Sequence, residues 1–267
     1  MTRYAIFSDV HANLEALTAV LDKAAGLKID RYICCGDIVG YGVDPNECID
    51  RLRASLAYSV MGNHEYAILF PRSGQYVGAK NEAQQSFDWT IKHLNHRNIE
   101  YLRNLPYFRR VDNIVFSHGS PVYPENFDYV RDNKLDWDIS DVNSHFQFNR
   151  EHKVKLAFYG HSHVAAVNLQ YQFKNGETDH LQLGDEAVID ILASRPSRKA
   201  MFLTGLVNVG SVGQPRDGNS KPVLVVYDDY KERIEFHRLE YDTRVTAQKI
   251  LGEGLDPWLA ERLSLGR

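Results

Sequence analysis

The chain has 267 residues, 43% of them hydrophobic, which is enough for a substantial core in one large domain or two small ones. Its net charge of −4 provides no general attraction to polyanions, so we expect no bulk nucleic-acid binding. No apolar run approaches the roughly 20 residues that a membrane-spanning helix needs. Three cysteines without CxxC spacing, and the absence of a signal-like start, favour a reduced, cytoplasmic protein with no membrane partner.

The first third of the chain alternates strand-like and helix-like segments. Apolar runs predict strands at 4–7, 32–35 and 58–61, and the spacing of leucine and valine predicts a helix over 13–25. A second helix begins after Asp44, which is followed by proline at the first helical position. This βαβαβ order favours a parallel sheet with helices packed against it.

The remainder of the chain is less regular. Residues 81–105 are predicted to be helical, 114–117 a strand, and 120–152 an insertion that forms a lid or a wall of the substrate site. Short strands then follow at 156–159, 164–173, 186–191, 201–209, 222–228 and 232–240. We expect them to form a second, mainly antiparallel sheet before helices that begin at Asp242 and Pro257. A single domain over 1–267 with two sheets fits this pattern.

Five short segments contain five of the eleven histidines, and each follows an apolar run. They are Asp9-Val10-His11, Gly36-Asp37, Gly62-Asn63-His64-Glu65, Ser117-His118-Gly119 and Gly160-His161-Ser162-His163. The carboxyl ends of strands are where α/β proteins place their chemistry. Imidazoles, carboxylates and one amide form the mixed N/O set that divalent metals prefer. The sequence therefore predicts a metal site.

Each segment taken alone also has a plainer explanation. A spacing of two places Asp9 and His11 on the same side of an extended backbone, but a helix-capping aspartate beside a surface histidine fits them as well. Asp37 could be a turn residue, and His118 could be a buried turn histidine. Five strand ends that all carry ligand-competent residues are hard to explain by chance, which favours the metal site.

In this order the five segments resemble those of the calcineurin-like metallophosphoesterases. The resemblance covers residues 4 to about 213, and the segments 9–17, 36–42 and 208–216 are similar to those of the small bacterial and archaeal phosphodiesterase branch. Some relatives there are associated with diadenosine tetraphosphate hydrolysis. The resemblance implies an α/β fold, a four-layer α/β/β/α sandwich of two mixed β-sheets flanked by helices.

The resemblance also implies two sets of metal ligands that share one residue. One metal would be held by Asp9, His11, Asp37 and His163. The other would be held by Asp37, Asn63, His118 and His161. No ligand of the family pattern is missing. The main variation is Glu65, where many relatives have aspartate; it leaves the ligands intact but makes the contacts around them less well defined by the resemblance.

Two carboxylates facing two divalent ions leave about two positive charges for a bridging hydroxide and a substrate phosphate. Ions roughly 3.5–4 Å apart would activate the hydroxide for in-line attack. His64 is not expected to be a ligand and would act as the catalytic residue at the leaving oxygen, a role worth about 10²–10⁴-fold. The donor set favours Mn, with Fe, Ni or Zn as alternatives.

Substrate contacts are less specific in the sequence. Arg216 follows a glycine-rich turn and could grip a phosphate, or be a surface arginine. Asn13 could contact substrate or cap the first predicted helix. The aromatic residues of the insertion could stack on a nucleobase or anchor the loop; they are Tyr123, Phe127, Tyr129 and Trp137.

Three functions are compatible with these residues. The first is a metal-dependent phosphoesterase of a small phosphodiester, phosphoanhydride or phosphomonoester, with dinucleoside polyphosphates as one substrate class. The second is a nuclease of the same family, which the acidic balance disfavours. The third is a scaffold that keeps the fold but has lost catalysis. Such a protein should lack some of the metal ligands of the family pattern, whereas this sequence has all of them. The oligomeric state is not indicated.

Overall fold

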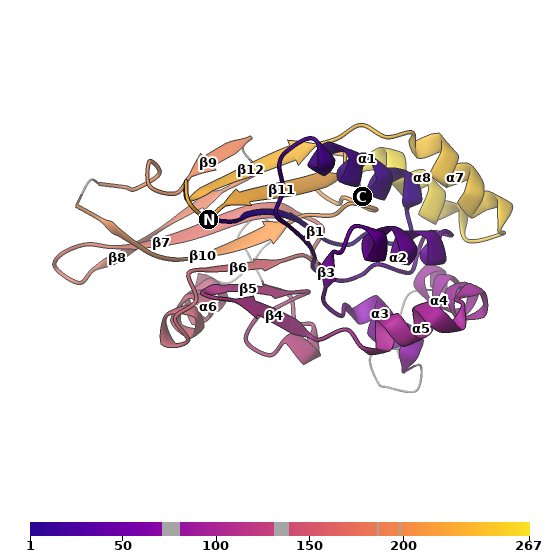
Figure 1. The fold of residues 1–267 in the computed structure, drawn as a ribbon, viewed down its shortest axis with the longest axis horizontal. Helices are drawn as coiled ribbons and strands as arrows, with labels where there is room; N and C mark the ends of the chain where they lie inside the picture. The colour runs from indigo at the N-terminus through magenta and orange to yellow at the C-terminus, as the bar shows by residue number, and fades with distance from the viewer. Residues whose placement is uncertain (71–80, 131–138, 186, 198) are drawn as a thin grey trace.

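Two six-stranded sheets pack face to face in the computed structural model, which describes residues 1–70, 81–130, 139–185, 187–197 and 199–267 (Figure 1). The first sheet contains, in spatial order, β3 (Tyr58–Ser59), β2 (Arg31–Cys34), β1 (Arg3–Phe7), β11 (Val223–Asp228), β12 (Arg233–Arg238) and β9 (Val188–Asp190). Strands β1, β2 and β3 run parallel, so their carboxyl ends lie at one edge. Strand β11 pairs antiparallel with β1, and the sheet is therefore mixed.

The second sheet is also mixed. Its spatial order is β4 (Phe108–Val111), β5 (Ile114–Ser117), β6 (Leu156–Tyr159), β10 (Met201–Val209), β7 (Ala165–Gln172) and β8 (Thr178–Leu183). Strands β5, β6 and β10 run parallel, while β4, β7 and β8 pair antiparallel with their neighbours. Each sheet thus has three parallel strands whose carboxyl ends share an edge.

Helices cover the outer faces of the two sheets. They are α1 (Leu14–Ala25), α2 (Pro45–Ala54), α3 (Asn63–Leu69), α4 (Asn81–His93), α5 (His96–Arg103), α6 (Ile139–Glu151), α7 (Thr243–Gly252) and α8 (Pro257–Leu265), with a short 3-10 turn η2 (Pro124–Asn126). In Figure 1, α1 and α2 lie beside the first sheet and α6 lies beside the second. The predicted helix over 13–25 is confirmed, and the predicted helices from Pro45, Asp242 and Pro257 are confirmed with it.

Alternating side chains of β1 show how the layers are joined. Ala5 and Phe7 belong to the cluster that packs against α1 and α2, whereas Tyr4 and Ile6 belong to the cluster between the two sheets. Strands of the second sheet bury their other face against Phe146 of α6. The order helix, sheet, sheet, helix confirms the predicted four-layer sandwich.

The division of strands between the sheets differs from the prediction. Strands β9, β11 and β12 join the first sheet instead of forming the second sheet with β6, β7 and β10. The first sheet is consequently not purely parallel. The predicted helix over 81–105 is two helices, because Leu94 and Asn95 separate α4 from α5. Strands β4 and β8 and helix α3 were not predicted.

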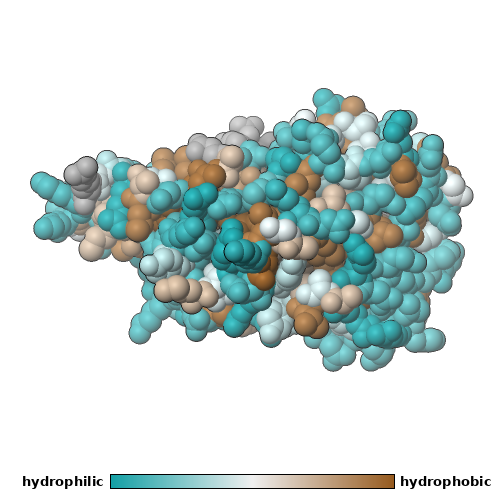
Figure 2. All heavy atoms as spheres, turned by 45° about the horizontal axis from the view of Figure 1, so that its top comes forward, coloured by the Kyte–Doolittle hydropathy of each residue, from teal (hydrophilic) through white to brown (hydrophobic). Residues whose placement is uncertain are grey.

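Within the described ranges, no helix is both long and apolar enough to cross a bilayer. Figure 2 shows hydrophilic side chains over most of the face it presents, with hydrophobic ones in scattered groups. All three cysteines are buried and free.

Candidate metal centre

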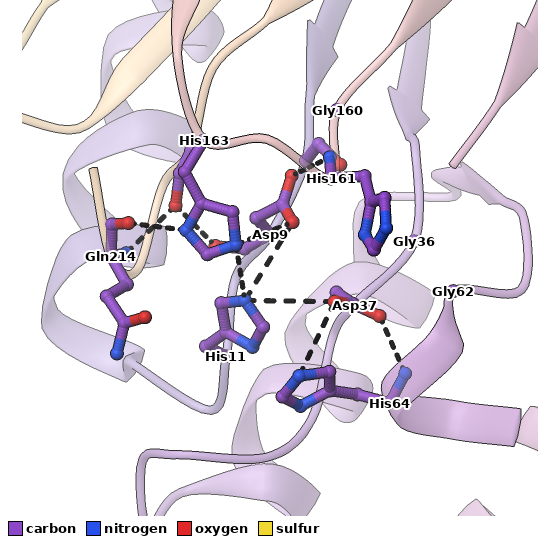
Figure 3. A network of polar contacts seen from close by, with 12 residues as sticks. Asp9, His11, Gly36, Asp37, Gly62, His64, Gly160, His161, His163 and Gln214 are labelled. Carbon is purple, nitrogen blue, oxygen red and sulfur yellow. Dashed lines mark hydrogen bonds and ion pairs between the residues drawn. The ribbon is translucent and has the colours of Figure 1, made fainter. Parts of the chain in front are cut away.

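The five predicted segments meet where the parallel strands of both sheets end. Asp9 and His11 follow β1, Asp37 follows β2, and Asn63 begins α3 after β3. His118 follows β5, and His161 and His163 follow β6. Hydrogen bonds join the two edges directly, from the Val212 amide to the Ser8 carbonyl (2.9 Å) and from the His161 amide to Asp9 Oδ2 (3.0 Å). Residues far apart in the sequence therefore share one buried site (Figure 3).

Five residues of the site have a left-handed backbone conformation, which the sequence did not suggest. Asp9, His11 and Asp37 have φ values of 55°, 49° and 51°, and His161 and His163 have 68° and 61°. The expectation that Asp9 and His11 share one side of an extended strand is therefore wrong; they converge through a tight turn. Left-handed non-glycine residues cost about 1–3 kcal/mol each and concentrate at functional sites.

Two glycines of the motifs make room for the carboxylates. A Cβ at Gly62 would lie 2.2 Å from Asp37 Oδ1, and a Cβ at Gly160 would lie 2.3 Å from Asp9 Oδ2. Both distances are far inside van der Waals contact. Only glycine at these positions lets the neighbouring chain approach the two carboxylates this closely.

The first group of donor atoms is formed by Asp9, His11 and His163, all buried. Asp9 Oδ1 lies 3.1 Å from His163 Nε2 and 3.8 Å from His11 Nε2. The two Nε2 atoms are 3.2 Å apart. Figure 3 shows the three side chains pointing toward one another. Their donor atoms lie close enough together to bind one ion.

The second group is formed by Asp37, His118 and His161, also buried. His118 Nε2 lies 3.3 Å from Asp37 Oδ2 and 3.0 Å from His161 Nδ1. The amide oxygen of Asn63 lies 2.9 Å from the same Nε2. Asp37 Oδ2 is also 3.8 Å from His11 Nε2, so this oxygen lies between the two groups.

Hydrogen bonds at the outer nitrogens set the tautomers of three histidines. His11, His118 and His163 direct Nδ1 at the carbonyl oxygens of Val39 (3.3 Å), Cys35 (2.8 Å) and Gln214 (2.5 Å). A carbonyl only accepts, so each Nδ1 carries a proton, and each Nε2 presents a lone pair to the centre when the ring is neutral. Metal-binding histidines are oriented in the same way.

Lone pairs that face each other require a cation between them. The Nε2 atoms of His11 and His163 face Asp9 Oδ1, which is buried and has no hydrogen-bond partner among the described residues. Without a shared proton or a metal ion, these contacts between acceptors would be repulsive. The residues present therefore fit divalent metal ions of the N/O-preferring kind.

The electrostatics of the cluster also favour bound positive charge. Burial alone would raise the pKa of Asp9 and Asp37, but the facing imidazoles hold both well below the usual value for aspartate. His118 shows the converse: burial lowers its pKa, and Asp37 outweighs that effect and raises it to about 9. Two ionised carboxylates buried among histidines attract a proton or a metal ion.

His64 lies beside the centre in apolar surroundings. Its ring packs edge-on against Phe87, with a centroid distance of 4.8 Å, and against Tyr41, at 4.6 Å. Burial lowers its pKa to about 4, so the imidazole is neutral near pH 7. His64 Nε2 is 3.8 Å from Asp37 Oδ2, and distance alone therefore also groups it with His11 and Asp37 as a metal-binding set. Its role as a non-ligand stays a prediction.

Glu65 has a larger part than the sequence suggested. Its buried carboxylate accepts hydrogen bonds from the amides of Asp37 (2.9 Å), Ile38 (2.7 Å), Val39 (3.0 Å) and Gly62 (2.8 Å). These amides belong to the loop that presents Asp37 and to the start of α3. A glutamate at the third position of a helix is a known signal for this capping of the preceding amide. The remaining three contacts depend on the left-handed turn at Asp37.

Replacement of Glu65 with alanine should therefore destabilise the protein strongly. Four buried N–H groups would lose their acceptor, and we expect the free energy of unfolding to fall by at least about 3 kcal/mol. Urea denaturation of the metal-free protein measures this effect. Glu100→Ala, at a glutamate whose side chain is 64% exposed, is the matched control and should change stability by less than about 0.5 kcal/mol. A loss below about 1 kcal/mol for Glu65→Ala would contradict the assigned role.

The two predicted substrate residues differ in their surroundings. Asn13 is buried and caps α1, because its side-chain oxygen accepts from the Ala16 amide (3.1 Å) and its side-chain nitrogen donates to the Gly213 carbonyl (3.0 Å). Its capping role is confirmed, and no contact to the metal ligands is seen in the described residues. Arg216 lies beside the centre, where its amide donates to the His163 carbonyl (3.2 Å). Its substrate role stays a prediction.

The aromatic residues of the insertion lie partly over the site. The Tyr129 ring stacks on His161 with a centroid distance of 3.9 Å, although this tyrosine is 47% exposed. Phe127 is buried edge-on to His118. Tyr123 is exposed, and Trp137 lies outside the described residues. Phe127 thus anchors the loop, and the partly exposed Tyr129 ring lies at the rim of the site.

Comparisons with known proteins agree with this geometry. The family model of the calcineurin-like phosphoesterases matches residues 2–165. "Uncharacterized protein MJ0912" of Methanocaldococcus jannaschii is 36% identical over 268 residues, which cover 98% of both chains. The crystal structure of a metallophosphoesterase from Sphaerobacter thermophilus is 30% identical, with a TM-score of 0.74, and covers 100% of this chain and 99% of its own.

A fourth comparison bears on the fold alone. The crystal structure of hypothetical protein PH1004 from Pyrococcus horikoshii OT3 has a TM-score of 0.75 at 22% identity, with 100% of this chain and 99% of that chain covered. The match to the family model and the relative that is 36% identical show that the chain belongs to the calcineurin-like phosphoesterase family, as its motifs indicated. This family consists of metal-dependent phosphoesterases, and the buried His/Asp groups described above are the residues able to bind metal.

Proposed function

We propose that this protein is a hydrolase of small phosphate esters or anhydrides that works with two divalent ions. The observation that carries the proposal is Asp37 Oδ2, which lies 3.8 Å from His11 Nε2 in one donor group and 3.3 Å from His118 Nε2 in the other. The first ion would be bound by Asp9, His11, Asp37 and His163. The second would be bound by Asp37, Asn63, His118 and His161.

The bound ions would supply a water nucleophile at neutral pH and neutralise charge on the phosphoryl oxygens. Manganese is the proposed native metal, and Fe, Ni and Zn suit the same donors. The chain's own contribution is to hold the donors in place before substrate binds. Backbone carbonyls orient His11, His118 and His163, and Glu65 holds the loop of Asp37. Such partners outside the ligand set are typically worth 10–100-fold in metal affinity or activity.

His64 and Arg216 would act on the substrate itself. The neutral His64 imidazole has one N–H to donate to the oxygen that leaves phosphorus, and its packing against Tyr41 and Phe87 holds the ring still. The Arg216 guanidinium keeps its Nε buried with no partner among the described residues, while Nη2 donates to Gln214 Oε1 (2.8 Å). A phosphoryl oxygen would satisfy the free Nε–H.

The proposed partner is a small phosphate ester, and dinucleoside polyphosphates are one class suggested by the family resemblance. No bulk nucleic acid is proposed, because the net charge is −4. The scaffold alternative is disfavoured, since all seven predicted ligands lie in the two buried groups or beside them.

Hydrolysis by chelator-stripped protein before and after reconstitution with Mn²⁺ tests the proposal. The substrates are bis-p-nitrophenyl phosphate, p-nitrophenyl phosphate and diadenosine tetraphosphate. We expect no turnover without metal and turnover of at least one substrate with it. Equal rates in the stripped and loaded samples would contradict the metal requirement. A loaded protein that turned over none of the three would favour a scaffold.

A further inference from the structure

A second arginine reaches the rim of the metal centre from the C-terminal helix. The Arg262 guanidinium carbon lies 5.9 Å from the centroid of the Tyr41 ring, and the guanidinium carbon of Arg216 lies 5.9 Å from the same centroid. Tyr41 in turn packs against two residues of the site, with centroid distances of 4.7 Å to His11 and 4.6 Å to His64. One aromatic ring thus links both arginines to the centre.

The fold holds Arg262 in this position. Leu259 and Leu263 of α8 are buried in a cluster against which Tyr41 packs. The end of α8 is fastened to the loop that carries Arg216, because the Gly218 amide donates to the Gly266 carbonyl (3.0 Å). Arg262 Nε donates to the main-chain oxygen of Arg267, the last residue of the chain (2.5 Å), which directs the side chain and leaves the other guanidinium nitrogens for a ligand. The arginine is therefore part of a packed element.

Among the residues that the structure describes, no side-chain carboxylate pairs with either guanidinium group. Glu82 of α4 acts on Arg262 only from beyond ion-pair distance. Burial, followed by the charge of Arg216, lowers the pKa of Arg262 to about 10. Placing two like charges near each other is unfavourable unless an anion binds to them.

We propose that Arg262 and Arg216 form a clamp for a second phosphoryl group, adjacent to the one that binds at the metal centre. The clamp selects phosphoanhydrides, such as nucleoside di- and polyphosphates, over esters with a single phosphoryl group. A planar guanidinium suits a phosphate because it donates two parallel hydrogen bonds. Arg262 is thus a specificity-determining residue, and this assignment rests on the proposed function of the metal centre.

Calorimetric titration of the Mn²⁺-loaded protein with two nucleotides tests the clamp without turnover. The probes are α,β-methylene-ADP, which carries two phosphorus groups and resists hydrolysis between them, and the analogue of AMP in which a methylene group replaces the ester oxygen, which carries one phosphorus group and resists hydrolysis. We expect Arg262→Gln to weaken the binding of α,β-methylene-ADP about tenfold and that of the AMP analogue less than twofold. Arg244→Gln, at an exposed arginine of α7, is the charge-matched control and should change neither affinity.

Arg262→Lys keeps the charge without the planar fork and should lose part of the preference, about threefold. If a thermal melt shows that Arg262→Gln folds poorly, the binding of the two nucleotides by Arg262→Lys tests the clamp in its place. Equal effects of Arg262→Gln on both nucleotides, or binding of neither one by the unaltered protein, would overturn the clamp. Hydrolysis of bis-p-nitrophenyl phosphate, p-nitrophenyl phosphate and diadenosine tetraphosphate by the same samples separates the two proposals. Turnover without nucleotide discrimination refutes only the clamp, and discrimination without turnover refutes only the phosphoesterase.

Discussion

Replacement of Asp37 with alanine is expected to lower the amount of metal bound by both donor groups and to lower kcat/KM by more than about 100-fold. Loss of a residue that merely supports a ligand costs up to about 100-fold in metal sites, and Asp37 would itself be a ligand to both ions. Its Oδ2 faces His11 in one group and His118 in the other, so its loss removes an oxygen donor from both groups. Metal analysis after reconstitution with Mn²⁺ and a kinetic assay with bis-p-nitrophenyl phosphate measure both effects.

Two further variants separate the loss of metal from a loss of folding. Asp37 Oδ1 accepts the His64 amide (2.9 Å), and alanine would remove this bond as well. Asp37→Asn keeps an acceptor of the same shape but loses the charge, and we expect it to be almost as inactive. Asp22→Ala, at an exposed aspartate of α1, should behave as the unaltered protein. Full metal content with normal turnover in Asp37→Ala would exclude a bridging role.

Replacement of His64 with alanine is expected to reduce kcat by about 10²–10⁴-fold while the metal content stays near normal. The reason is that seven other residues supply the donors of the two groups, whereas the His64 ring is packed against Tyr41 and Phe87. The measurement is kcat together with bound manganese per chain in the same preparation.

A control for this variant must account for packing. His64 contacts Phe87, Tyr41 and His11, so removal of the ring leaves a cavity and lowers stability somewhat. His64→Gln fills more of the space and should recover stability without recovering kcat. His180→Ala, at an exposed histidine of β8, should leave kcat and metal content as they were. Loss of both ions from His64→Ala would show that His64 is a ligand.

Local signals predicted which residues meet at this site. Each ligand follows a strand that is recognisable from an apolar run, and parallel strands bring their carboxyl ends to a common edge. The helix over 13–25 was predictable from its periodicity, and the capping role of Asn13 from its position in front of it. These features depend on residues within a few positions of one another.

Features that depend on distant contacts could not be predicted. Strand β11 is buried throughout and β10 is buried from Thr204 onward, and both are largely apolar, so their sequences do not reveal which sheet each one joins. The left-handed turns at Asp9 and His11 arise from backbone hydrogen bonds to Gly36 and Asp37, across the sheet. Arg262 belongs to no motif, and only the packing of α8 on Tyr41 brings it to the site.

Titration of metal-stripped protein with Mn²⁺, with bound metal and hydrolysis of bis-p-nitrophenyl phosphate followed together, tests the central claim most directly. Two facing donor groups that share Asp37 predict saturation at two ions per chain, with activity that rises as the second ion binds. Saturation at one ion, or full activity before the second ion binds, would contradict the two-metal account.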